Sequence, residues 1–522
     1  MNKHLASKDF IGTNDLNVFA ALVKAAKKHG FNKLIVIDGD DRKLTYGDIL
    51  KGSHALGQAL SRLSKPHEKI GMLLPTSAGS LVTFFALLAY GRIPAMINFT
   101  AGRQAIEAAC TSAEVSTILT SRRFVSIANI EPLIAEISQF AKIVYLEDVR
   151  EKLSLGDKVS ALVGSKFPEV LGQRANPDDP CTLLFTSGTE GEPKGVALSH
   201  TNIVANVRQV QIAIPFDQSD IFFNPMPIFH SYGLVAGCVL PVLLGNKVIL
   251  HPSPLQVKQI PVRVHETSAT IMIATDTFLR QYARAGEDGS LSSLKYVVCG
   301  AERVRPETRQ MALDRFDFLL VEGYGVTETS PVLACNSPLD NRPGTVGRAL
   351  PWIETRLEAV EGIAEGGKLY VRGPNIMMGY LSVDRPGVIV PPKDGWHDTG
   401  DIVQIDDEGL ITISGRLKRF AKIGGERVSL TFSEAAAARC RPDDTHAAAA
   451  LPDKQKGEII VLLTESENLT RDMLVDAAQE IGAPEISIPR HVKQVDEIPL
   501  LGNGKVNFGA VNKLAREAFA NV

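Results

Sequence analysis

Apolar residues recur along the first part of the chain at two alternating spacings. Helical spacing is found in residues 16–29, 44–63 and 81–90, where apolar positions return every three or four residues. Short apolar and β-prone runs lie between and after them, at residues 33–38, 70–74, 117–119 and 143–145. Strands that alternate with helices are typical of an α/β domain with a largely parallel sheet. The pattern therefore predicts that the chain begins with such a domain.

The pattern changes after residue 343. From there to residue 416 short strands and turns follow one another, which predicts a small β-subdomain. The remaining residues return to alternating helices and strands. A length of 522 residues is too great for one ordinary core. We therefore expect a large N-terminal domain of α/β subdomains over residues 1–416, which includes the β-subdomain from about 343 to 416, and a small α+β domain over 417–522.

Two long apolar stretches could be mistaken for membrane spans. Residues 81–99 contain Arg92 and Pro94, and residues 233–250 contain Pro241, Gly245 and Lys247. Charged and turn-forming residues interrupt both, so we expect them to be buried core. Residues 1–14 are polar and lack the apolar centre of a signal peptide. We therefore expect a cytoplasmic protein, and peripheral contact with the inner face of the membrane stays open.

Composition narrows the class of protein further. The formal net charge of −3 argues against a general nucleic-acid-binding protein. The six cysteines are scattered, and none forms a C-x-x-C pair. They are typical of reduced core residues in an intracellular protein, not of a disulfide framework or a zinc site.

Residues 186–195, TSGTEGEPKG, carry the clearest chemistry of the chain. They follow a predicted buried strand at 181–185, and Ser199 is predicted to cap the helix that comes next. Glycines let backbone N–H groups approach an anion closely, and hydroxyl groups and Lys194 add donors and charge. The loop therefore suits the phosphates of a nucleotide, through Thr186, Ser187, Gly188, Thr189, Gly191 and Lys194. A glycine-rich surface turn is the plainer interpretation.

The loop does not have the P-loop pattern, in which Ser or Thr follows Gly-Lys directly. Here Pro193 precedes Lys194 and Gly195 follows it. The loop instead resembles the phosphate loop of the adenylate-forming superfamily, which includes acyl-CoA synthetases and acyl-ACP synthetases. Glu190 stands where that family usually has Thr.

Three later segments resemble further motifs of this superfamily, in the same order. They are YGVTE at residues 324–328, WHDTGD at 396–401 and PLLGNGK at 499–505. The last departs from the usual form, with Leu501 and Asn503 where Thr and Ser are typical. The resemblance implies an enzyme that uses ATP and Mg²⁺ to activate a carboxylic acid as acyl-AMP.

The resemblance also implies roles for individual residues around the nucleotide. Tyr324 would stack on adenine, Thr327 would contact the α-phosphate, and Glu328 would hold the metal ion. An aromatic face suits a purine, and a carboxylate suits Mg²⁺. Further expected contacts are the adenine edge at Gly300, Ala301 and Glu302, and the ribose at Asp401 with Arg416 nearby.

Three other positions receive roles from the same resemblance. His230 would line the pocket of the acid, although a histidine between apolar segments is more often a core residue. Its task would be positioning, because a carboxylic acid with a pKa of about 4 is already ionised at neutral pH. Lys418 falls at the hinge before a mobile C-terminal domain, and Lys505 would contact the carboxylate and α-phosphate.

The thiol acceptor is suggested by longer passages such as MPIFHSYGL and GRLKRFAKIGGERVSLT. They look similar to bacterial acyl-ACP synthetases and to the synthetase half of 2-acylglycerophosphoethanolamine acyltransferase. This implies a fatty acid substrate and the phosphopantetheine thiol of holo-acyl carrier protein as acceptor. A basic cluster opposed only by Glu426 would attract an acidic carrier; it comprises Arg416, Lys418, Arg419, Lys422 and Arg427.

Two alternatives stay open. CoA carries phosphates of its own, so the same basic cluster suits an acyl-CoA synthetase. A protein of another class, an inactive or carrier-loading adenylate-binding module, would share the motifs. Intact Lys194, Glu328, Asp401 and Lys505 argue against loss of activity.

Overall fold

The computed structural model describes residues 17–168, 175–186, 193–363, 365–423, 426–453, 456–500 and 506–519. The chain divides into two compact units. The first comprises Met1–Glu354 with Arg372–His397, and the second comprises Thr355–Val371 with Asp398–Val522. The expected boundary at residue 416 was placed at a hinge between domains that would move relative to each other. The two units are defined by how their residues pack together, so the boundary at 416 stays a prediction.

One large sheet of the first unit has a parallel centre, as the alternating pattern predicts. Antiparallel strands lie at both of its edges. Across the sheet the order is β15 (Arg348–Ala349), β14 (Val332–Cys335), β13 (Leu319–Gly325), β12 (Tyr296–Cys299), β11 (Ile271–Ala274), β9 (Ile221–Asn224), β10 (Lys247–Leu250), β1 (Leu34–Asp38) and β2 (Lys43–Thr45).

A second large sheet of the same unit is parallel over one half and antiparallel over the other. Its order is β19 (Arg385–Val390), β18 (Gly379–Ser382), β8 (Lys194–Ser199), β7 (Pro180–Thr186), β4 (Ile93–Met96), β3 (Lys69–Met72), β5 (Thr117–Thr120) and β6 (Lys142–Tyr145). Strands β18 and β19 come from far along the chain, so residues near 195 and 381 become neighbours.

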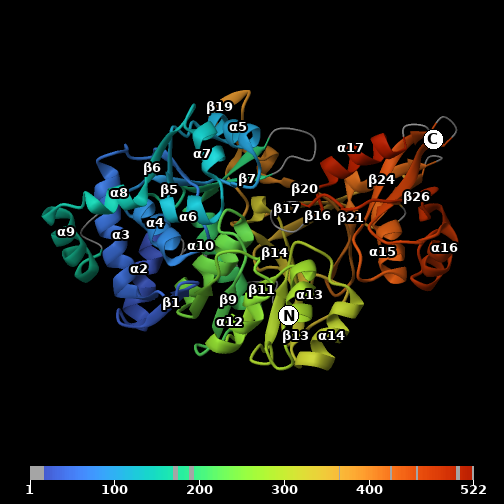
Figure 1. Ribbon diagram of the computed structural model, residues 1–522, viewed down its shortest axis with the longest axis horizontal. Coiled ribbons are helices and arrows are strands. Elements are labelled where there is room, and N and C mark those ends of the chain that lie inside the picture. Colours follow the sequence, from blue (N-terminus) through green and yellow to red (C-terminus); the bar gives the residue numbers. More distant parts are fainter. Residues whose placement is uncertain are drawn as a thin grey trace. The chain divides into compact units, whose positions relative to one another are not determined.

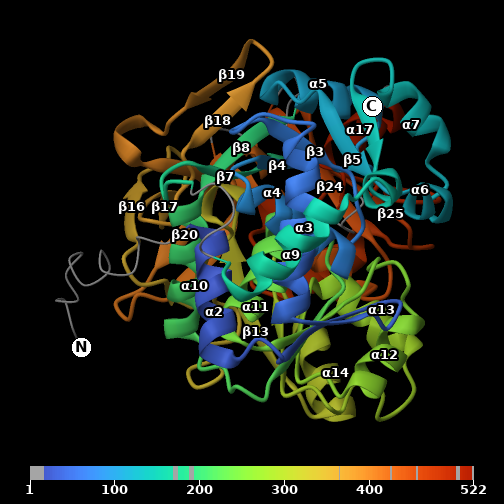
Figure 2. The same cartoon turned by 90° about the vertical axis from the view of Figure 1, so that its left-hand side faces the viewer.

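Helices cover these sheets (Figures 1 and 2). One buried apolar cluster includes residues of both sheets and of the helices α2, α4 and α10, so the sheets share a core. The helices of the first unit are α2 (Val18–His29), α3 (Tyr46–Ser61), α4 (Ala78–Ala89), α5 (Arg103–Ala113), α6 (Arg122–Ile127), α7 (Glu131–Ile137), α8 (Leu146–Glu151), α9 (Leu155–Lys166), α10 (His200–Ala213), α11 (Leu240–Leu244), α12 (Gln259–Thr267), α13 (Asp276–Ala285) and α14 (Pro306–Phe316).

Local signals in the sequence set several helix starts. The side chain of Ser199 accepts a hydrogen bond from the backbone N–H of Asn202, at 3.1 Å, which confirms the predicted cap of α10. Thr45 and Asp48 form a reciprocal capping box at the start of α3. These side chains satisfy N–H groups that the first helical turn leaves without a partner.

The second unit contains a small sheet and an α+β body. The small sheet has the order β16 (Glu354–Glu358), β17 (Gly367–Arg372), β20 (His397–Ile405) and β21 (Ile411–Arg416). The body has the order β23 (Glu426–Ser429), β22 (Phe420–Ile423), β25 (Gly457–Thr464) and β24 (His446–Asp453), with β26 (His491–Gln494) beside β25, and the helices α15 (Leu430–Cys440), α16 (Arg471–Glu480) and α17 (Phe508–Ala518).

The two long apolar stretches are buried, as expected. The second of them forms a π-helix at Tyr232–Val239, then α11 and β10, and Gly245 ends α11 with a positive φ of 88°. Among the residues that the structure describes, we find no helix with the length and apolar character needed to cross a membrane. All six cysteines are free, and five of them are buried.

Candidate functional site

The predicted phosphate loop joins two hydrogen-bonded strands. Thr186 ends β7, Lys194 begins β8, and the two residues are partners in the antiparallel register. Both residues therefore stand at the same end of the β7–β8 pair, within the second large sheet. The expected residues Ser187, Gly188, Thr189 and Gly191 lie outside the described residues, as does Lys505.

Tyr380 of β18 connects Lys194 to Glu328. The Lys194 Nζ atom lies 5.1 Å from the centre of the Tyr380 ring. The Tyr380 hydroxyl donates a hydrogen bond to Glu328 Oε1 at 2.6 Å. Pairing of β18 with β8 holds Tyr380 beside Val196, two residues after Lys194. The fold thus gathers a cation, a phenol and a carboxylate that lie far apart in the sequence.

Thr327 and Glu328 stand in a short 3-10 turn directly after the strand β13. The backbone N–H of Met377 donates to the carbonyl of Glu328 at 2.8 Å, which ties this turn to the segment before β18. The hydroxyl of Ser231 donates to Thr327 Oγ1 at 3.4 Å, and His230 is its neighbour in the chain. His230 is half-buried, with its ring centre 4.7 Å from that of Phe229.

The expected adenine-edge residues follow the end of β12. Gly300 packs closely against Tyr232, since an added Cβ would lie 3.3 Å from the phenol carbon Cζ. Ala301 is exposed and has a positive φ of 71°. The Glu302 carboxylate accepts a hydrogen bond from the backbone N–H of Thr277, in the first turn of α13, at 3.0 Å.

Tyr324 lies within β13 opposite Ala334, and only 8% of it is exposed. The Tyr324 side chain is therefore almost wholly buried.

Burial raises the pKa of Tyr232, the phenol that packs against Gly300, well above its usual range. That hydroxyl stays protonated and donates to the Val298 carbonyl at 2.7 Å.

Asp401 and Arg416 form an ion pair within the second unit. Arg416 Nε lies 3.0 Å from Asp401 Oδ1, and the two residues are register partners of β20 and β21. The Asp401 side chain is 5% exposed, whereas the Arg416 side chain is 49% exposed. The guanidinium therefore orients a carboxylate that is otherwise enclosed.

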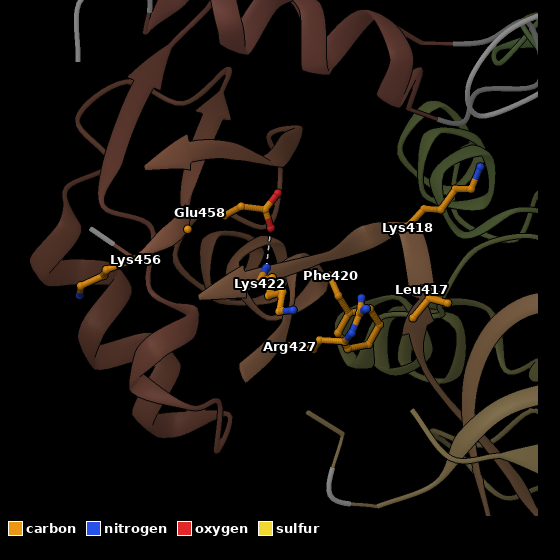
Figure 3. A pocket seen from close by; sticks show the side chains of 8 residues that line it. Leu417, Lys418, Phe420, Lys422, Arg427, Lys456 and Glu458 are labelled. Atoms are coloured by element: carbon orange, nitrogen blue, oxygen red, sulfur yellow. Dashed lines mark hydrogen bonds between the residues drawn. The ribbon is translucent and has the colours of Figure 1, made fainter. Parts of the chain in front are cut away.

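A basic pocket of about 650 Å³ lies in the same unit (Figure 3). It is lined by residues of β22, β23 and β25 and of the turns that precede β22 and β25. These residues are Leu417, Lys418, Phe420, Lys422, Arg427, Lys456, Gly457 and Glu458. The Glu458 carboxylate accepts a hydrogen bond from the backbone N–H of Lys422. Three of the five predicted basic residues thus line one open pocket, and Lys456, which the sequence analysis did not include, joins them.

A magnesium ion fits the donors of the first unit only in part. Within the described ranges, no set of three or more His, Cys, Asp and Glu side chains could hold a metal ion by itself. Mg²⁺ commonly takes one or two protein carboxylates and completes its shell with phosphate oxygens and water. Glu328 offers one such carboxylate beside Lys194, so it suits an ion that arrives with a nucleotide.

Sequence reasoning did not single out Tyr380 or Ser231 as site residues. Tyr380 lies in the passage GPNIMMGYL at residues 373–381, and its contact with Glu328 depends on the β8–β18 pairing. Ser231 follows His230 directly, and its hydrogen bond to Thr327 spans 96 residues. Neither contact follows from local spacing.

The chain is similar to known proteins in its sequence and in its fold. The family model "AMP-binding enzyme" matches residues 22–381. A probable CoA ligase of Humulus lupulus is 26% identical over 94% of this chain and 92% of its own length. The medium-chain fatty-acid–CoA ligase of Escherichia coli is 23% identical over 91% of this chain and 86% of its own length.

Among solved structures, O-succinylbenzoate coenzyme A synthetase from Bacillus subtilis, in complex with ATP and magnesium ion, has the same fold. Its TM-score is 0.79 at 20% identity, over 93% of this chain and 98% of that one. Both sequence relatives are named as CoA ligases, whereas the sequence analysis expected a carrier protein as the acceptor.

Proposed function

Because this chain belongs to the AMP-binding enzyme family, we propose that it is an ATP-dependent acid–thiol ligase that transfers an acyl group to CoA. The observation that carries the proposal is the Lys194–Tyr380–Glu328 cluster, which joins β8 and β18 of the second large sheet to the turn after β13. A cation and a carboxylate held apart by a phenol can bind the two ends of a metal-bound phosphate chain. The names of the relatives support CoA as the acceptor.

The first half of the reaction joins the acid to AMP. A carboxylate oxygen attacks the α-phosphorus of ATP in line, the bond to the bridging oxygen breaks, and pyrophosphate leaves. The ionised carboxylate needs no base, so catalysis consists of positioning and charge neutralisation. Lys194 and Thr327 donate to phosphate oxygens, and Glu328 would hold Mg²⁺, which when bound would neutralise charge on the polyphosphate.

The second half transfers the acyl group to a thiol. The thiol loses its proton to solvent, the sulfur attacks the acyl carbon, and AMP leaves with the bonding electrons. Lys505 acts in the first half only, and rotation of the C-terminal domain about Lys418 then admits the thiol. In a Lys505→Ala variant the rate of pyrophosphate release should therefore fall by about a hundredfold or more. Unchanged release of pyrophosphate by that variant would contradict this role.

The acid is a fatty acid in this proposal. Support comes from the Escherichia coli relative and from the apolar residues around His230, such as Phe229 and Leu234, both buried. The test is pyrophosphate release from ATP and Mg²⁺ on addition of acids of increasing chain length. If none of the acids elicits pyrophosphate release, the alternative of a nucleotide-binding module without activity is supported.

Acyl carrier protein is a second candidate acceptor, because the basic pocket of the second unit suits an acidic partner. The two acceptors are separated by offering holo-acyl carrier protein and CoA in parallel with one fatty acid. Thioester on CoA alone supports the proposal, and thioester on the carrier alone overturns it in favour of an acyl-ACP synthetase. A Lys456→Glu variant should raise the KM for the true acceptor without changing pyrophosphate release.

A further inference from the structure

Helix α9 has its large apolar side chains on the outside. Leu155, Val159, Leu162 and Val163 are exposed by 80%, 58%, 52% and 41%, and Phe167 at the C-terminal cap is exposed by 61%. Their spacing of three and four residues places the four aliphatic side chains on one side of the helix. We call these five side chains the α9 face. A surface helix normally turns such a stripe toward the core.

The inward side of α9 is small and polar, and it is anchored. Asp157 is 1% exposed and receives two hydrogen bonds from Arg62, at 2.6 and 2.8 Å. Hydrogen bonding from Arg62 holds the pKa of Asp157 well below its usual range. Gly164 fits against the His54 ring of α3 so closely that a Cβ would lie 2.4 Å from it. These contacts fix the helix with its apolar side outward.

Exposed charge along residues 150–168, the segment that carries the α9 face, is mostly positive, although the whole chain carries −3. Over residues 150–168 the exposed charged side chains are Arg150, Lys152, Lys158 and Lys166, against Glu151 alone. Lys158 and Lys166 are on α9 itself, among the exposed apolar residues. Basic residues beside a row of Leu, Val and Phe are the composition of a helix that lies in a lipid interface.

We propose that the α9 face binds the surface of an anionic lipid bilayer. The helix lies on the outside of the first unit, at the left-hand edge of Figure 1 and in front in Figure 2. The apolar side chains would enter the boundary between headgroups and acyl chains, and the lysines would stay level with the headgroup phosphates. Phosphate charge complements the local excess of basic residues, whereas a second copy would place lysines against lysines.

Vesicle binding by the full chain tests this proposal. We expect co-sedimentation with vesicles of phosphatidylcholine and phosphatidylglycerol in equal parts, and much weaker binding to phosphatidylcholine alone. The double variant Val159→Ser/Leu162→Ser should bind the anionic vesicles at least about tenfold more weakly. Lys158→Gln/Lys166→Gln should lower binding by about tenfold or more, and added salt should remove the difference.

A matched control changes the same two residue types, one Leu and one Val, at another surface of the first unit. Leu255 and Val262 are exposed by 66% and 53%, so Leu255→Ser/Val262→Ser removes the same groups from another surface. This control should bind vesicles as the parent does. A Phe167→Trp variant gives a second readout that does not depend on sedimentation, because its emission should shift to the blue on anionic vesicles only.

Several outcomes would overturn the proposal. One is that the Val159→Ser/Leu162→Ser variant and the control bind vesicles equally well, when circular dichroism shows that both are folded. Another is a concentration-dependent dimer that the Val159→Ser/Leu162→Ser variant dissolves, because a second copy would then cover the face. A third is equal binding to neutral and anionic vesicles, because it would show that the lysines do not select an anionic surface.

Discussion

In the proposed reaction the Tyr380 hydroxyl would set the orientation in which Glu328 meets Mg²⁺. Its hydrogen bond of 2.6 Å fixes one carboxylate oxygen, and the same ring lies under Lys194. We expect Tyr380→Phe to lower kcat with MgATP by about tenfold to a hundredfold, because a hydrogen bond to a charged group is lost. The dependence of the rate on Mg²⁺ concentration should shift to higher concentrations.

Tyr296→Phe is the control for that experiment. The Tyr296 hydroxyl is buried and has no hydrogen-bond partner among the described residues. Removing it should leave kcat and the Mg²⁺ dependence unchanged. If Tyr380→Phe behaves like Tyr296→Phe, Tyr380 does not position Glu328.

Also at the scale of single residues, His54 makes the first unit sensitive to acid. It is fully buried between the rings of Phe19 and Tyr90, and neither ring nitrogen has a partner among the described residues. Burial lowers the pKa of His54 to about 4. Between this value and the unfolded value near 6.5, the unfolded state binds the proton and the folded state does not. The free energy of unfolding therefore falls as the pH is lowered through this range, by up to about 3 kcal/mol.

A His54→Leu variant should lose part of this acid sensitivity. Urea unfolding near pH 7 and near pH 4.5, followed by tryptophan fluorescence, measures it, because Trp352 and Trp396 both belong to the first unit. His200 and His251 should keep the remainder, since burial also lowers the pKa of each to about 4. An unchanged difference between the two pH values in His54→Leu would contradict the assignment.

At the scale of elements, the packing of α9 on α3 depends on Gly164. A methyl group there would overlap the His54 ring, at 2.4 Å, although alanine is the better helix former. We expect Gly164→Ala to destabilise the first unit by about 1–3 kcal/mol in urea unfolding. At Gly156, on the exposed first turn of the same helix, an added Cβ would meet only Ser154 Oγ, at an ordinary contact distance of 3.5 Å, so Gly156→Ala should be neutral or slightly stabilising.

Combining Gly164→Ala with His54→Ala should recover part of the loss, because the added methyl group then has room. Equal effects of Gly164→Ala and Gly156→Ala would show that α9 does not pack closely on α3. The same comparison bears on the α9 face, since close packing on α3 is what keeps that face outward.

At the scale of the whole molecule, the proposed two-step reaction requires the C-terminal domain to rotate about Lys418. Proline fixes φ, so Lys418→Pro should restrict this rotation. We expect thioester formation to fall by about tenfold or more while pyrophosphate release is retained. Lys418→Ala removes the same side chain without restricting the backbone, and it should keep both activities. Equal loss in both variants would assign the effect to the side chain.

The course of the chain was largely predictable. The helices at 16–29, 44–63 and 81–90 and the intervening strands were found within a few residues of their expected limits, because period and caps are local properties. The expectation that the acceptor is a carrier protein found no support among the relatives named above, which are CoA ligases. Basic residues near Lys418 suit either acceptor, so charge alone did not discriminate between them.

The sequence by itself determined the types of element, the α/β class and the chemistry offered by Lys194, Thr327 and Glu328. Only the tertiary structure decided that Tyr380 stands between Lys194 and Glu328, and that α9 turns its apolar side outward. Both depend on pairing between distant segments, β18 with β8 and α9 with α3. Periodicity reports which side of a helix is apolar, but which side is buried depends on what the rest of the chain places against it.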